Sequence, residues 1–457
     1  AESIVLAVAG GAAGLGLAAA LMAWVAAKAP AAVPNLSAMH LDWRVLGYAL
    51  TLAVASVVMF GLLPSWHATA IHRQGIGTQR ALLTVELALA LAVLVSSGLL
   101  LRSLAAVRNV NPGFDPRGLL AVPVSTDCSG DACLAWTRSL LQHAQALPGV
   151  KAAAFVMQPP LEGFMWISHY YAVGASVPEN TQPWTEMNFV TPGYFSVLGA
   201  NLLSGREFAD SDSAGGAKVA IVNRNLARKV WPRGRGVGNQ LHLQGQWRTV
   251  VGVVQDLKQT ALDQPVGPAA FLPYAQMPVQ WGNLMLRTSG GGGATAAELR
   301  QSVGGAGSPT TVKAAEDMSA LVDRTTAPRR FETDLLAGFG GLALMLAATG
   351  VYGVSAFAAA QRRCEFAIRA ALGAQRRQLI ELALRSSLAW IGMGVLAGLA
   401  LGLVGGSLLR GLLFGVSRWD AVSFTGAALL LALLALLAAW LPAYRAARQD
   451  PAAELRR

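Results

Sequence analysis

The stretch between residues 362 and 385, RRCEFAIRAALGAQRRQLIELALR, gathers much of the charge in this sequence. It holds six Arg and two Glu, whereas only 13% of the whole chain is charged. Glu365 and Arg369 are four residues apart, the spacing at which a helix forms a well-oriented ion pair. Apolar side chains lie between and around them, and a glycine follows as a natural helix stop. The pattern predicts a short helix that docks on a protein partner, through Glu365, Phe366, Ile368, Arg369, Leu372 and Gly373.

A second interpretation of this stretch stays open. Arginine-rich loops are retained in the cytoplasm during membrane insertion, so the charge alone can be explained as a topology signal. That interpretation does not explain the compact apolar and ion-paired helix within the loop. We therefore favour the docking helix.

No motif for catalysis or nucleotide binding accompanies this stretch. The sequence has no G-x-x-x-x-G-K-[ST], whose glycines would cradle phosphates, and it has no H-E-x-x-H or G-x-S-x-G. The six His residues are scattered over different loops. We therefore expect no catalytic residue, no metal and no cofactor bound by this chain.

Cys128 and Cys133, in TDCSGDAC, are candidates for a small disulfide if this segment lies outside the cell, where oxidising conditions prevail. The alternative is two ordinary small residues at a turn between a strand and a helix. Zinc is not expected, because no His or further Cys lies near them in the sequence.

The elements that position these residues are dominated by apolar helices. With 54% hydrophobic residues, the chain contains six runs near the roughly 20 residues that a helix needs to cross a bilayer. The Arg-rich loop at 360–386 and the tail after Tyr444 are expected to be cytoplasmic by the positive-inside rule. The predicted spans lie at 3–27, 46–64, 81–101, 335–359, 387–409 and 422–441.

This threading places more than 200 residues, between about 108 and 330, outside the cytoplasm. Val- and Leu-rich runs such as those at 119–125 and 150–156 alternate there with helical patterns such as 132–147, which indicates an α+β domain of two subdomains. The segment has 19 Lys or Arg and 15 Asp or Glu. Basic and acidic residues are thus nearly balanced in this segment, and most of the chain's excess of basic residues lies in the loops and tail that set the membrane topology. Nucleic-acid binding is therefore not expected.

The membrane part also contains a repeat. Residues 41–70 align without a gap on residues 419–448, with Asp42 on Asp420 and Pro64 on Pro442. Two similar halves are implied, of which the first lacks its front part. A row of glycines in the second half is interpreted as a helix-packing ridge, since small residues let helix backbones approach closely. The row consists of Gly394, Gly398, Gly402 and Gly406.

The segment CEFAIRAALGAQRRQLI resembles the E-x-x-I-R-x-A-L-G-A signature of FtsX-like ABC transporter permeases of the MacB type. Other stretches look like parts of the same family, among them VNPGFDPRGLL (110–120), TPGYFSVLGANLLSGREF (191–208) and GVYGVSAF (350–357). The resemblance is strongest to duplicated permeases with two such units in one chain, of which this sequence would be an N-terminally truncated fragment. Cys364 and Ala367 depart from the usual pattern, where arginine and glycine are common.

The resemblance implies a bundle of about six transmembrane helices in the bacterial inner membrane, with an extracytoplasmic α+β domain of MacB periplasmic-core type. It divides the chain into the last two spans of a first unit (1–75), the first span of a second unit (76–107), the core domain (108–330) and a permease domain with three spans and the coupling helix (331–457). The chain would transmit ATP-driven motion for export or extraction of a substrate.

The resemblance also implies the partners. They are a separate ABC ATPase carrying ATP and Mg, membrane lipids, a paired second permease unit and, as an open alternative, a periplasmic adaptor or outer-membrane partner. A different function within the same family also stays open, namely transmembrane signalling that controls a cell-envelope hydrolase without transport.

Overall fold

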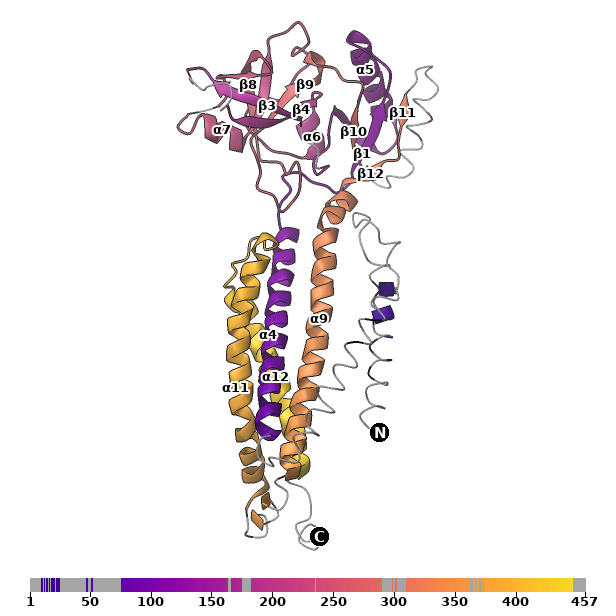
Figure 1. The fold of residues 1–457 in the computed structure, drawn as a ribbon. Coiled ribbons are helices and arrows are strands. Elements are labelled where there is room, and N and C mark those ends of the chain that lie inside the picture. Colours follow the sequence, from indigo (N-terminus) through magenta and orange to yellow (C-terminus); the bar gives the residue numbers. More distant parts are fainter. Residues whose placement is uncertain are drawn as a thin grey trace. The chain divides into compact units, whose positions relative to one another are not determined.

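The computed structural model describes residues 75–162, 166–174, 182–234, 236–289, 310–361 and 374–446, together with single residues between 10 and 51 and between 298 and 372 (Figure 1). The chain divides into two compact units. A membrane unit comprises Ala1–Arg108 and Ala327–Arg457, and a core domain comprises Asn109–Thr326. The spans predicted at 3–27 and 46–64 lie largely outside the described residues, so six spans stay a prediction.

The described part of the membrane unit has four helices long and apolar enough to cross a membrane. Each exceeds the roughly 20 residues that a bilayer requires, and α9 continues well beyond the span predicted at 335–359. The helices are α4 (Gly75–Arg108), α9 (Met318–Gln361), α11 (Arg376–Leu408, followed by the short η5, Leu409–Gly411) and α12 (Ala421–Ala446).

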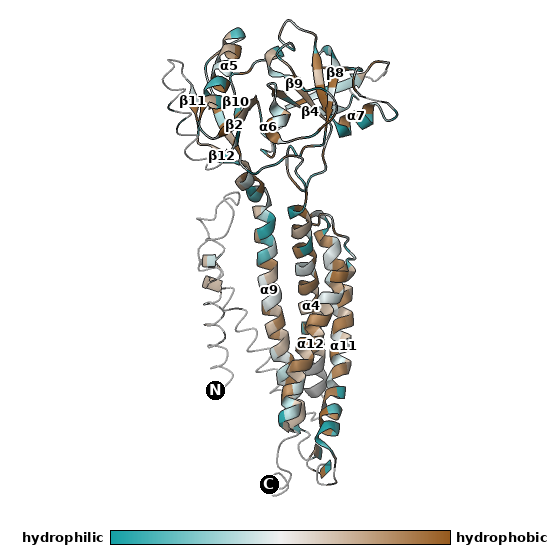
Figure 2. Cartoon of the chain, turned by 180° about the vertical axis from the view of Figure 1, so that it is seen from behind, coloured by the Kyte–Doolittle hydropathy of each residue, from teal (hydrophilic) through white to brown (hydrophobic). Residues whose placement is uncertain are grey.

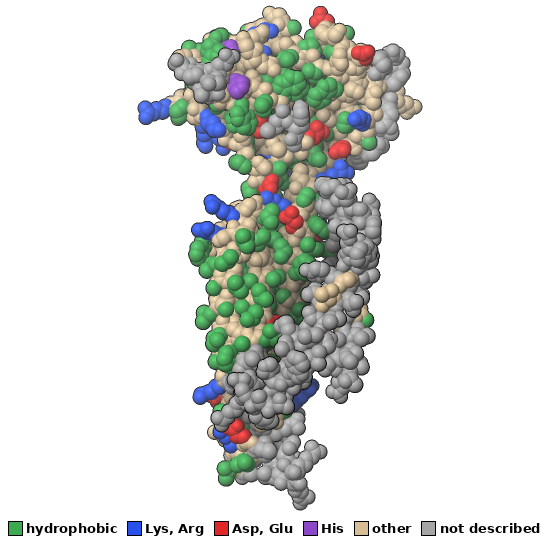
Figure 3. All heavy atoms as spheres, in the orientation of Figure 1, with side chains coloured by type: hydrophobic (Ala, Val, Ile, Leu, Met, Phe, Trp, Pro, Cys, Tyr) green, Lys and Arg blue, Asp and Glu red, His purple; other side chains and the backbone are tan. Residues whose placement is uncertain are grey.

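These helices pack through one buried face each. Leu87, Leu91 and Leu99 of α4 are fully buried, together with Leu431 and Ala435 of α12. The opposite faces carry exposed apolar side chains, which Figure 2 shows as brown along the helices and Figure 3 as a broad green surface. A water-soluble monomer rarely exposes so large an apolar surface, whereas lipid tails would cover it.

The core domain contains a 12-stranded mixed sheet that closes partly on itself. Strands β4, β3, β7, β8, β6 and β9 follow one another, and a parallel pairing of β9 with β4 completes a six-stranded ring. Beyond β4 the sheet continues through β2, β10, β1 and β11, while β12 pairs with β1 and β5 with β8. The strands are β1 (Leu119–Ser125), β2 (Val150–Val156), β3 (Trp166–Ala172), β4 (Trp184–Val190), β5 (Leu202–Gly205), β6 (Val219–Asn223), β7 (Gln240–Leu243), β8 (Gln246–Val254), β9 (Ala269–Pro273), β10 (Trp281–Thr288), β11 (Thr311–Val312) and β12 (Glu316–Asp317).

Three helices complete the core domain within residues 109–289. α5 (Asp131–Ala146) buries Leu140 and Ala144 in the common core, and aromatic rings fill the space beneath it, with Phe155 edge-on to Tyr274 at 4.8 Å between centroids. The other helices are α6 (Tyr194–Leu198) and α7 (Arg224–Val230), with the short η4 (Tyr274–Gln276) after β9. The predicted α+β character is correct, and the two predicted subdomains share one continuous sheet.

Candidate functional site

The short segment predicted to dock on a partner is helical at Glu365, Phe366, Ile368 and Arg369, and Leu372 lies in a turn after them. Arg369 and Glu365 form an ion pair of 2.8 Å one helical turn apart. Phe366 is only 5% exposed, whereas Ile368 and Leu372 are 52% and 83% exposed. The three apolar side chains thus divide into one buried anchor and two that face outward. Gly373 lies outside the described residues.

The segment is joined to α11 by a very short connection. The amide of Ala374 donates to the carbonyl of Arg369 (3.0 Å), and the next residue, Gln375, already caps α11. Gln375 and Gln378 form a reciprocal capping box, in which each side chain accepts from the other residue's amide. α11 therefore begins four residues after Leu372, the last described residue of the docking segment.

The glycine row lies on the face of α11 that packs against α4. Gly394, Gly398, Gly402 and Gly406 face, in this order, Leu87, Leu91, Val95 and Leu99. A Cβ atom added to Gly398 would lie 2.7 Å from the Cβ of Leu91 and 2.9 Å from the carbonyl oxygen of Ala88. Only a residue without a side chain permits this approach, so the row fixes the α4–α11 contact.

At one end of the bundle, polar side chains tie the helices to the loop between α11 and α12. The hydroxyl of Ser103 on α4 accepts from the amide of Phe414 (2.8 Å), and Arg329 on α9 donates to the carbonyl of Leu412 (2.6 Å). Arg102 on α4 pairs with Asp420.

Asp420 also caps α12, because its other oxygen accepts from the amide (2.8 Å) and hydroxyl (2.7 Å) of Ser423. Sequence reasoning did not find the ties made by Arg102, Ser103 and Arg329. One signal was present, since the repeat places an aspartate, Asp42, at the position equivalent to Asp420.

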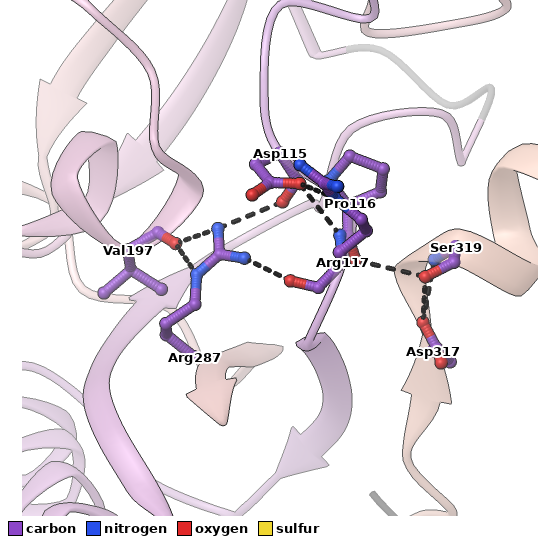
Figure 4. Close-up of polar contacts among 7 residues, drawn as sticks. All are labelled: Asp115, Pro116, Arg117, Val197, Arg287, Asp317 and Ser319. Carbon is purple, nitrogen blue, oxygen red and sulfur yellow. Dashed lines mark hydrogen bonds and ion pairs between the residues drawn. The ribbon is translucent and has the colours of Figure 1, made fainter. Parts of the chain in front are cut away.

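Within the core domain, the segment that follows α4 is bonded to β10 and to the first turn of α9 (Figure 4). Arg287 on β10 donates to the carbonyls of Val197 (2.9 and 2.7 Å), Arg117 (2.7 Å) and Asp115 (3.0 Å). The hydroxyl of Ser319, in the first turn of α9, donates to the carbonyl of Pro116 (3.3 Å).

We call the group drawn in Figure 4 the junction; it consists of Asp115, Pro116, Arg117, Val197, Arg287, Asp317 and Ser319. A hydrogen bond from the amide of Arg117, aided by the guanidinium groups of Arg117 and Arg287, holds the pKa of Asp115 below its ordinary value. Sequence reasoning missed the junction, because its members come from four distant segments.

The remaining predicted site residues are the two cysteines. The sulfur atoms of Cys128 and Cys133 are bonded in the structure, at the start of α5. Among the described residues, no three His, Cys, Asp or Glu side chains lie together as a metal site would require. The described chemistry of the site is therefore ion pairing, helix packing and hydrogen bonding.

Comparisons with known proteins agree with this architecture. A family model described as MacB-like periplasmic core domain matches residues 82–306, and one described as FtsX-like permease C-terminal matches residues 337–451. The chain therefore belongs to the MacB/FtsX family of ABC transporter permeases. It is a permease with a periplasmic core domain, from a family of the inner membrane whose members work with an ABC ATPase.

Individual relatives are identical to the chain at about a quarter of the aligned positions. The uncharacterized ABC transporter permease YknZ of Bacillus subtilis is 26% identical over 282 residues, which are 59% of this chain and 69% of YknZ. The macrolide export ATP-binding/permease protein MacB of Escherichia coli K12 is 27% identical over 286 residues. That match covers 59% of this chain and 43% of MacB, so the chain spans less than half of that relative.

Solved structures were also found. The periplasmic region of MacB from Actinobacillus actinomycetemcomitans covers 49% of this chain at a TM-score of 0.32 and 10% identity, with 96% of that region matched. The extracellular domain of YknZ from Gram-positive bacteria covers 42% at a TM-score of 0.29 and 16% identity, with 99% of that domain matched. TM-scores this low add nothing to the family assignment.

Proposed function

We propose that this chain is a permease of the mechanotransmission type, in which a separate ATPase moves the core domain by displacing the docking segment. The observation that carries the proposal is the division of the segment's apolar residues. Phe366 is buried and anchors the segment, while Ile368 and Leu372 are exposed beside the Glu365–Arg369 ion pair. An exposed apolar pair next to charges of both signs is suited to a groove on a protein partner.

Two routes lead from the docking segment to the core domain. In the first, the capping box passes motion to α11, and the glycine row locks α11 to α4, whose chain continues into the junction. In the second, α9 is one helix of 44 residues with Pro328 inside it, and the chain runs through it from Ser319 toward the docking segment. Because Ser319 bonds to Pro116, both routes end at the same place in the core domain.

This mechanism predicts which parts of the transporter lie on each side of the membrane. The Arg-rich stretch and the ATPase lie in the cytoplasm, and the core domain lies outside, as the positive-inside rule predicts. ATP and Mg are bound by the ATPase. The chain supplies a lever for export or extraction of a substrate handled outside the membrane, and a second permease unit completes the transporter.

The test is co-purification of the full-length permease with candidate ATPase subunits, followed by measurement of ATP hydrolysis. Glu365→Lys should abolish stimulation of hydrolysis. Glu381→Lys is the matched control, since Glu381 and Arg385 form a similar ion pair of 2.9 Å at the same i,i+4 spacing on α11. Exposed pairs of this kind contribute only about 0.2–1 kcal/mol to folding, so neither variant should unfold the protein.

Equal loss of ATPase stimulation in both variants, or full stimulation by Glu365→Lys, would contradict docking at this segment.

A second assay on the same complex distinguishes export from signalling. Release of a labelled substrate that depends on ATP supports export, whereas ATP-dependent activation of an added cell-envelope hydrolase without release supports signalling.

A further inference from the structure

One segment of the core domain is basic because it lacks acidic residues. Residues 213–255 contain seven Lys or Arg and no Asp or Glu, although the stretch from 108 to 330 contains 19 and 15. The rest of that stretch is therefore acidic, with 12 basic and 15 acidic residues. Such an asymmetry within one domain indicates an anionic partner for the basic side.

The structure places four of these basic residues on α7 and the turn after it. Arg228, Lys229 and Arg233 are exposed and Arg224 is half-buried, whereas Leu226 is fully buried. Among the described residues, none of the four basic side chains has a carboxylate oxygen within 4.0 Å.

We call Arg224, Arg228, Lys229 and Arg233 the basic surface. Figure 3 shows Lys and Arg side chains gathered over and beside α7 on the face drawn. A basic surface without internal carboxylates keeps its full charge for an external partner.

An aromatic side chain accompanies these charges. Trp231 ends α7 and is half-buried, with its ring 3.3 Å from the place where a Cβ atom on Gly236 would lie. Tryptophan beside lysine and arginine is the combination that favours the interface between lipid headgroups and water. A soluble acidic partner would need the charges but not the indole.

Hydrogen bonds tie α7 to the segment that leaves the membrane. The amide of Asn225 donates to Asp256 (2.9 Å), and the neighbouring Lys258 donates its amide to the carbonyl of Pro112 (2.9 Å). Gln255 donates its side-chain amide to the carbonyl of Gly113 (2.5 Å). Gly113 is five residues beyond the end of α4, so the chain holds it within about 18 Å of that helix end.

We propose that the basic surface binds the anionic headgroups of phospholipids in the leaflet from which α4 emerges. A Lys or Arg near an anionic lipid surface gains about 1 kcal/mol, so each residue strengthens binding by roughly fivefold. The contact would hold the α7 side of the core domain at the membrane while the docking segment supplies motion. It is a property of the core domain and does not depend on the ATPase.

The experiment uses the full chain in nanodiscs of phosphatidylcholine, with or without phosphatidylglycerol. In a Cys364→Ser background, a fluorophore is attached to Gly234→Cys, where an added Cβ would lie 3.9 Å from the Cβ of Trp231 and no closer to any other described residue beyond its chain neighbours. The control label is Gln142→Cys on the exposed side of α5. Quenching by lipids with a nitroxide headgroup reports contact with the membrane surface.

We expect at least twofold stronger quenching at position 234 with phosphatidylglycerol than without it, and loss of this difference at high salt. The combined change Arg228→Glu, Lys229→Glu and Arg233→Glu should remove it. The matched change Arg138→Glu, Lys151→Glu and Lys313→Glu has the same charge effect at exposed sites outside α7 and should retain it. A neutral variant, with Arg228→Gln, Lys229→Gln and Arg233→Gln, should lose most of the difference in quenching at position 234.

Three results would overturn the proposal. They are equal quenching with and without phosphatidylglycerol, equal loss in both charge-reversed variants, and binding of soluble polyglutamate at position 234 with no response to lipid. The last result would identify an acidic polymer as the partner.

Discussion

Replacing Gly398 with alanine is the sharpest test of the packing between α11 and α4. The added Cβ would lie 2.7 Å from the Cβ of Leu91, whereas carbon atoms prefer about 3.5–4.0 Å. The helices must therefore separate by roughly 1 Å, which forfeits a quarter to a half of the dispersion energy of the neighbouring contacts. Overpacking of this kind costs about 1–3 kcal/mol.

The same helix offers a matched control. No described residue lies within 4 Å of a Cβ atom added to Gly392, so Gly392→Ala brings the same gain in helix propensity without a clash. We expect Gly398→Ala to be less stable than Gly392→Ala by about 1–3 kcal/mol, measured from SDS-induced unfolding in mixed micelles. Gly398→Ala should also reduce ATPase stimulation, because α11 then packs less tightly against α4. Equal stability of the two variants would refute the account of the glycine row.

Three further predictions concern the core domain. Arg287→Ala leaves carbonyls at the junction without their donor and should lower the free energy of unfolding by about 2–4 kcal/mol, measured by denaturant titration. Asp212→Asn should cost about 1–3 kcal/mol at pH 7 and flatten the acid limb of a stability–pH profile, because hydrogen bonds from Arg206 lower the pKa of Asp212. Reduction of the Cys128–Cys133 disulfide should lower stability by about 2 kcal/mol, seen as a lower Tm in dithiothreitol.

The sign of the pH effect follows from the lowered pKa. The stabilisation by Asp212 is complete above the unfolded value of about 3.9 and is lost as pH falls through the lower folded value. Asp210→Asn, at an exposed carboxylate two residues away, is the control for Asp212→Asn and should leave both the stability and its pH dependence unchanged.

Arg138→Ala, at an exposed arginine on α5, is the control for Arg287→Ala at the junction. Effects as large as those of Asp212→Asn and Arg287→Ala in these controls would contradict the assignments.

The sequence predicted those features whose signal is local. Apolar runs gave the four described spans, and the spacing of glycines gave the face of α11 that meets α4, because a helix repeats every few residues. A strand such as β1 was found because it is a continuous apolar run that is buried over most of its length. In contrast, β3 (WISHYYA) mixes polar and aromatic residues and alternates in burial, so no apolar run marks it.

Features that depend on distant segments could not be predicted in this way. The ring closes through a parallel pairing of β4 with β9, about 80 residues apart in the chain, and nothing in either strand specifies that partner. Arg287 finds its acceptors on segments 90 to 172 residues away. In the docking segment the sequence supplied three apolar residues, and only the structure separated the buried Phe366 from the exposed Ile368 and Leu372.

The most direct measurement is the distance between spin labels on α4 and α9, at Leu101→Cys and Asp334→Cys, in the complex with the ATPase. Both positions are exposed. ATP binding should shift the distance distribution in the wild-type background and with Arg385→Glu, and it should leave Arg369→Glu unchanged. An unchanged distribution in the wild-type background, with the ATPase bound and hydrolysing ATP, would contradict mechanical transmission through these helices.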